Sequence, residues 1–166
     1  MAMVERIEVD TSSLVALLDA LRAEADADKL RRELAENLAE VVEEAAGEAR
    51  AAITSMPVHI IATPELRSAV AAGVQASVRL GRNPRGAVVA DNAGMPRGFR
   101  NAPMRLNSTR GWRHQVFGYP DVWRTQFGKP GWFNDTISQH RPQAERAAKK
   151  VLDDMERRIS ARTREG

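Results

Sequence analysis

Cysteine is absent from this chain of 166 residues, and aromatic side chains make up only 5% of it. Without cysteine the fold has no disulfides and no thiolate-bound metal ions, a composition that fits a reducing cytoplasm. No stretch approaches the roughly 20 apolar residues that cross a bilayer, and the charged amino end does not resemble a secretory signal. We therefore expect a soluble chain with no membrane partner.

Residues with recognisable catalytic or metal-binding spacing are also scarce. The three histidines, His59, His114 and His140, are far apart in the sequence and have no cysteine or HExxH partners. The glycines at 81 and 86 lack the GK[ST] ending of a phosphate-binding loop. These patterns predict a protein that is not an enzyme and that has no cofactor, no metal site and no catalytic residues.

Charge is distributed unevenly along the chain. Its formal net charge of +3 combines −7 for residues 1–56, +8 for residues 57–134 and +2 for residues 135–166. Two interpretations are open. An acidic patch on one copy can meet a basic patch on the next and fix their register, or the acidic segment is simply the solvated side of a helix.

Two segments have the apolar periodicity of amphipathic helices. The first runs from Ser13 to Met56-Pro57, either as one long helix or as two helices that meet at Ala27. The other opens near Asn134 or Asp135, with Pro142 either kinking it or starting its main part. The expected buried positions are Leu30, Leu34, Leu38, Val41, Val42, Ala45, Ala49 and Ile53 in the first helix, and Ala144, Ala147, Ala148, Val151, Leu152, Met155 and Ile159 in the second.

Other segments between residues 4 and 105 have the features of strands, turns and loops. Val4–Val9 alternates apolar and charged residues, and Val74–Leu80 and Ala87–Ala90 flank turn residues as in a hairpin. Thr63-Pro64 predicts the start of a short helix, and residues 91–105, rich in Gly, Pro and Arg, predict a long loop. The expected fold is α+β: a long N-terminal helix and a C-terminal helix packed on a small, mainly antiparallel sheet.

We expect one domain over residues 1–166. Residues 1–12 are predicted to be an arm or an edge strand, and residues 160–166 a frayed tail.

Most aromatic residues lie in one loop-like segment, GWRHQVFGYPDVWRTQFGKPGWF, at residues 111–133. It contains all three tryptophans, three of the four phenylalanines and the only tyrosine. Such a cluster packs either into the core or against a partner. The first alternative places Trp112, Val116, Phe117, Trp123 and Phe133 against the chain's own helices; the second makes Trp132 and Phe127, beside glycine and proline, anchors of contacts between copies.

This segment resembles a signature of the tail-component family of long-tailed bacteriophages, named for gene product ten of coliphage Hong Kong ninety-seven. The shared pattern is W-R-H-x-V-F-G, then W, then G-x-P-G-W-F, with Gln115 where many relatives have proline. The matching residues are Trp112, Arg113, His114, Val116, Phe117, Gly118, Trp123, Gln126, Pro130, Gly131, Trp132 and Phe133. The order of helices, β-like runs and aromatic segment is similar along most of the chain.

The resemblance implies a structural virion protein that joins head and tail in the neck of a phage or prophage, made in the host cytoplasm. Implied partners are further copies in a closed ring, with six favoured over twelve, and neighbouring neck, tail-terminator or tail-tube proteins. The expected protomer interface consists of Trp132, Phe127, Phe133, Trp123 and Phe117. Five arginines are expected to face either DNA in the lumen, bound without sequence specificity, or acidic helices of neighbours: Arg82, Arg85, Arg97, Arg100 and Arg105.

Nucleic-acid binding is the alternative function. Eight arginines between residues 79 and 113 are interleaved with glycine and aromatic residues, a composition that can neutralise phosphates and stack on bases. No recognition-helix or RNP-like motif accompanies them. A toxin-like ribonuclease is a third alternative, which incubation with RNA would test.

Overall fold

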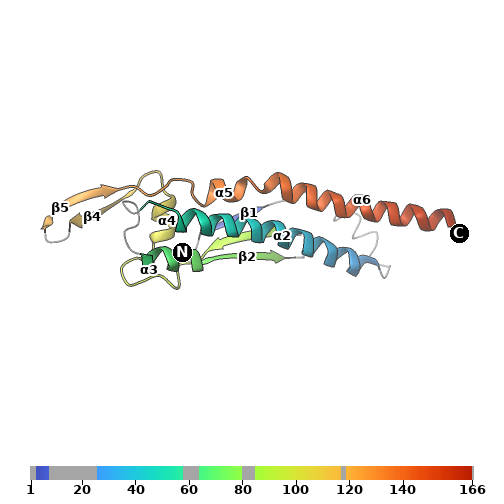
Figure 1. Ribbon diagram of the computed structural model, residues 1–166, viewed down its shortest axis with the longest axis horizontal. Coiled ribbons are helices and arrows are strands. Elements are labelled where there is room, and N and C mark those ends of the chain that lie inside the picture. Colours follow the sequence, from blue (N-terminus) through green and yellow to red (C-terminus); the bar gives the residue numbers. More distant parts are fainter. Residues whose placement is uncertain (1–2, 8–25, 58–63, 80–84, 117–118, 166) are drawn as a thin grey trace.

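The computed structural model describes residues 3–7, 26–57, 64–79, 85–116 and 119–165 (Figure 1). These residues form an α+β fold, as the sequence predicts. Helix α2 (Asp26–Thr54) lies between a three-stranded sheet and the C-terminal helix α6 (Arg141–Glu165), and it contacts both. Both the sheet and α6 thus pack against α2.

The apolar stripe of α2 forms the centre of the core. All eight predicted positions from Leu30 to Ile53 are buried, and so is Ala46. The helix ends at Thr54, two residues before Met56, whose side chain is also buried. The prediction for this helix is confirmed from Asp26 onward, whereas the earlier start at Ser13 lies outside the described residues.

The C-terminal helical segment is divided in two. Helix α5 (Asn134–Ser138) ends before His140, and Pro142 occupies the second position of α6, where a missing amide proton costs little. Ala144, Ala148, Val151 and Met155 are buried, while Ala147 and Leu152 are partly buried against the core. Helix α6 packs on α2, whereas α5, the first part of the predicted helical segment, contacts both α2 and the strand Met3–Ile7 of the sheet. The backbone of α6 is helical to Glu165, and the fraying of residues 160–166 stays a prediction.

The larger sheet has the strand order β1-β3-β2 and is antiparallel throughout. Strands β2 (Val74–Arg79) and β3 (Arg85–Ala90) are the predicted hairpin, and β1 (Met3–Ile7) pairs with β3 as an edge strand. Val74, Val88 and Ala90 are buried toward α2. A Cβ atom at Gly86 would lie 2.2 Å from Cγ2 of Val42, so glycine allows the sheet to approach the helix this closely.

Two short helices complete the body. Helix α3 (Pro64–Ala72) begins at the predicted proline and buries Leu66 and Val70. Helix α4 (Ala102–Asn107) occupies the end of the segment predicted as a loop, and Ala102, Pro103 and Leu106 are buried there. Residues 91–101 contain turns but neither helix nor strand. The predicted apolar run at residues 58–61 lies outside the described residues.

Gly47 is an avoidable weakness in the middle of α2. A Cβ atom at this position would meet nothing within 4 Å. We expect Gly47→Ala to raise the free energy of unfolding by about 0.5–1 kcal/mol, because glycine loses more backbone entropy in a helix than alanine. Urea denaturation would measure the change.

Gly73→Ala is the matched control for this prediction. Its new Cβ atom would lie 2.4 Å from the backbone oxygen of Asp91, so this variant should be destabilised. Equal effects of the two substitutions would contradict the packing described here.

Candidate assembly surface

A second, two-stranded sheet projects from one end of the body (Figure 1). Strand β4 (Trp112–Val116) pairs antiparallel with β5 (Tyr119–Gln126), with an irregularity between Gln115 and Val116. We call this hairpin, residues 112–126, the arm. The prediction of a loop-like segment is wrong here: its backbone pairs as strands, although Pro120 lies in β5.

The two faces of the arm each combine a cation with an apolar side chain. Arg113 pairs with Thr125 and Gln115 pairs with Trp123, so these four residues share one face. The guanidinium carbon of Arg113 lies 5.7 Å from the ring centroid of Trp123, within the range of a cation–π interaction. Arg124 pairs with His114 and Gln126 pairs with Trp112, so these residues belong to the opposite face.

The arm exposes much apolar surface. Tyr119, Val122 and Trp123 are 65%, 45% and 50% exposed, and Phe127, directly after β5, is 55% exposed. An isolated two-stranded hairpin is marginally stable in water, and clustered exposed apolar residues mark interaction sites. The geometry therefore favours a contact surface over a hydrophobic mini-core.

The base of the arm is fixed tightly to α4. Gly111 has a φ of +63°, and a Cβ atom at Gly128 would lie 2.3 Å from the backbone oxygen of Leu106. Asn107 joins the two segments, because its backbone oxygen accepts a hydrogen bond from Gly131 and its side-chain oxygen accepts one from the amide of Phe133. These contacts orient the arm relative to the body.

Trp132 and Phe133 belong to the core and not to the surface. They are 1% and 0% exposed, and their rings meet edge to face with centroids 5.4 Å apart. The Trp132 indole Nε1 donates to the backbone oxygen of Pro103 over 3.4 Å. The expectation that turns expose Trp132 is therefore wrong, and neither side chain offers surface to a neighbouring copy in this conformation.

The other predicted interface residues differ in their exposure to solvent. Trp123 and Phe127 are exposed and available for contacts, whereas Phe117 lies outside the described residues. Trp112 is partly buried against the core, as the alternative prediction of internal packing requires, but Trp123 does not follow that prediction. Tyr119 and Val122 are also exposed, and the sequence alone does not identify them as interface residues.

Four of the five predicted arginines lie in the described residues, where they are exposed but not gathered in one element. Arg85 lies in β3, Arg97 and Arg100 lie in the turns before α4, and Arg105 lies in α4, whereas Arg82 is outside the described residues. Phe99 and Met104 are exposed in the same stretch as three of these arginines. This stretch is thus a second mixed basic and apolar surface.

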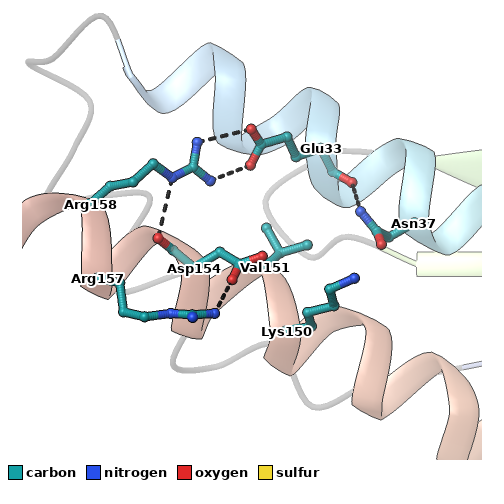
Figure 2. A pocket seen from close by; sticks show the side chains of 7 residues that line it. All are labelled: Glu33, Asn37, Lys150, Val151, Asp154, Arg157 and Arg158. Atoms are coloured by element: carbon teal, nitrogen blue, oxygen red, sulfur yellow. Dashed lines mark hydrogen bonds and ion pairs between the residues drawn. The ribbon is translucent and has the colours of Figure 1, made fainter.

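A cleft of about 420 Å³ lies between the first half of α2 and the middle of α6 (Figure 2). Across it, Arg158 donates two hydrogen bonds to the carboxylate of Glu33, with N–O distances of 2.9 and 2.5 Å. Arg157 pairs with Asp154 on the α6 side, and Lys150 also lines the cleft. Ion pairs occupy most of its charged groups, so we interpret it as a polar seam between the helices.

The pKa of Glu33 lies below its ordinary value. The hydrogen bonds from Arg158 are the main cause; burial opposes the shift, and the positive charges of Arg158 and Lys29 reinforce it. Because the folded state favours the charged carboxylate, this contribution to stability is complete above the unfolded pKa of about 4.3 and is lost as pH falls through the lower folded pKa.

We therefore expect the free energy of unfolding of Glu33→Gln to fall less on acidification than that of the parent chain. The effect should stay below about 1 kcal/mol, because both side chains are partly exposed. Unfolding free energies measured in urea between pH 3 and 7 would show a flatter profile than that of the parent chain. Arg158→Gln should flatten it similarly, and an unchanged profile in both variants would contradict the assignment.

His140 ties the α5–α6 junction to α2. It is 6% exposed, its Nε2 lies 3.0 Å from Oε2 of Glu48, and its Nδ1 lies 3.3 Å from Oε1 of Gln143. The side-chain Nε2 of Gln143 in turn donates a hydrogen bond to Oε2 of Glu44 over 2.6 Å. Both ring nitrogens of His140 are thus within hydrogen-bonding distance of side chains on α2 or α6. We assign this histidine a structural role.

Within the described residues, no group of three or more His, Cys, Asp or Glu side chains could hold a metal ion. Nor is any helix there long and apolar enough to span a membrane. Comparisons of the chain with family models, curated proteins and solved structures found no match.

Proposed function

We propose that this chain is a non-enzymatic structural subunit of the neck of a tailed phage or prophage, which joins head to tail as part of a closed ring in the virion. The observation that carries the proposal is the arm: a fixed, projecting hairpin with exposed aromatic residues, formed by the segment whose sequence resembles the phage tail-component family. A projecting element of this kind can supply one side of the head-to-tail contact that generates a ring.

The distribution of the family-like residues supports this role. Trp132 and Phe133 pack internally and secure the base of the arm, whereas Trp123 lies exposed on the arm itself. One part of the pattern thus supports the fold, and another is available for contacts between proteins. We favour rings of six, with twelve as the alternative, and neck, tail-terminator or tail-tube proteins as neighbours.

The test is mass measurement by light scattering together with negative-stain microscopy of the purified protein, at several concentrations and at low and high salt. Closed rings are the expected result. Trp123→Ala should remain folded by circular dichroism but assemble at least about 2 kcal/mol less favourably, as for a buried interface anchor. A protein that stays monomeric at every concentration and salt would contradict self-assembly into a ring.

Nucleic-acid binding is the second candidate, favoured by the exposed Arg97, Arg100 and Arg105 beside Phe99. Phosphate contacts release counterions, so affinity for DNA would fall steeply as salt rises. A titration of the chain with double- and single-stranded DNA at several salt concentrations separates the two candidates. No binding at low salt would remove this one.

A further inference from the structure

The outer side of α2 carries a row of exposed carboxylates. Glu36, Glu40 and Glu43 recur at spacings of four and three residues, which places them on one face, and all three are exposed. Glu43 pairs with Arg50 over 2.7 Å, but no ion pair joins Glu36 or Glu40 to another described residue. We call these three residues the acidic row.

Such a row is unfavourable in an isolated chain, because like charges four residues apart on a helix repel each other. A cationic partner would relieve this repulsion. Ala39 is exposed beside the row, so a flat side chain could lie against the helix between the carboxylates. The surface therefore suits a partner that presents both positive charge and an aromatic ring.

The arm has the complementary chemistry. Arg113 and Trp123 lie together on one face with Thr125, and none of them is buried. The arm projects from the end of the body beyond α4 and points away from α2 (Figure 1). A contact between arm and acidic row in a single chain would need the arm to fold back, so a second copy is the natural occupant.

We propose that the Arg113 and Trp123 face of the arm of one copy docks on the acidic row of the next copy, with Arg113 between Glu36 and Glu40 and the indole against Ala39. This inference deepens the proposed function, on which it rests, by naming the two surfaces that meet. The contact is heterologous, since the arm and the row are different surfaces, and repeating it generates a ring or an open filament.

Charge exchange between the two surfaces tests the contact. Arg113→Glu and Glu40→Arg should each weaken self-association roughly tenfold or more, because each places like charges together. The double variant Arg113→Glu/Glu40→Arg should recover most of the loss. Glu156→Arg, on the exposed side of α6, is the matched control and should assemble like the parent chain.

Engineered cysteines give a second test that does not depend on charge, because the chain has no cysteine of its own. A Thr125→Cys chain mixed with an Ala39→Cys chain should form a mixed disulfide on mild oxidation, visible on non-reducing gels and located by mass spectrometry. Thr125→Cys mixed with Ser68→Cys, an exposed position on α3, should form markedly less.

The outcomes separate the two proposals. Rings that form without the mixed disulfide, and without rescue by charge exchange, overturn this contact but leave the ring function standing. Linked chains that never close support the contact and contradict the ring. A monomer that gives neither overturns both. If instead Arg113→Glu abolishes DNA binding without affecting self-association, the arm is a nucleic-acid surface and the contact proposed here is overturned.

Discussion

Replacing Trp132 by alanine is expected to lower the free energy of unfolding by about 3–5 kcal/mol, as for other buried tryptophans. The side chain is almost completely buried, meets Phe133 edge to face, and donates to Pro103 of α4. Its removal would leave a cavity where α4, α5 and the base of the arm meet. Urea denaturation followed by circular dichroism at 222 nm, a signal of the helices, would measure the loss.

Trp123→Ala is the matched control for that experiment. The same chemical change at a half-exposed position on the arm should shift stability by no more than about 0.5 kcal/mol. The two variants thus separate folding from assembly within one aromatic segment. Equal stability losses would show that Trp123 is buried in the monomer, contrary to the structure.

Leu38→Ala should have the second largest effect, a loss of about 2–5 kcal/mol. Leu38 is fully buried in α2, which both the sheet and α6 contact, so the two layers are expected to lose stability together. Thermal unfolding observed by near-UV and far-UV circular dichroism should then show a single transition at a lower temperature.

Leu152→Ala provides the comparison, since this leucine is only partly buried at the edge of the core. Its loss should be less than half as large, because little cavity forms where the side chain already borders solvent. Two separate transitions in Leu38→Ala, one for the sheet and one for α6, would contradict the central role of α2.

The regular parts of this fold could be predicted because their apolar spacing is long and uninterrupted. The stripe from Leu30 to Ile53 indicates both the helix and its buried face, and Val74–Arg79 alternates as a half-buried strand should. Proline at residue 64 likewise indicates the start of α3. In each case, local periodicity and tertiary packing favour the same structure.

The arm could not be predicted in the same way. Pro120 interrupts the strand pattern of β5, and both faces of the hairpin mix polar and apolar side chains, so no face resembles one turned toward a core. For the adjacent Trp132 and Phe133, the local sequence does not predict burial. Nearby glycine and proline indicate turns, but only the position of Pro103, 29 residues earlier in the sequence, explains why the indole is buried.

The placement of β1 has a consequence for the order in which the protein can form. Met3 pairs with Ala90, so β1 has no partner on β3 until the whole segment between these two residues has been synthesised. Contacts so distant in sequence slow folding, since a long loop must close first. Until β1 and β3 pair, the edges of both strands expose unpaired backbone N–H and C=O groups. Another chain can bind to these groups during synthesis.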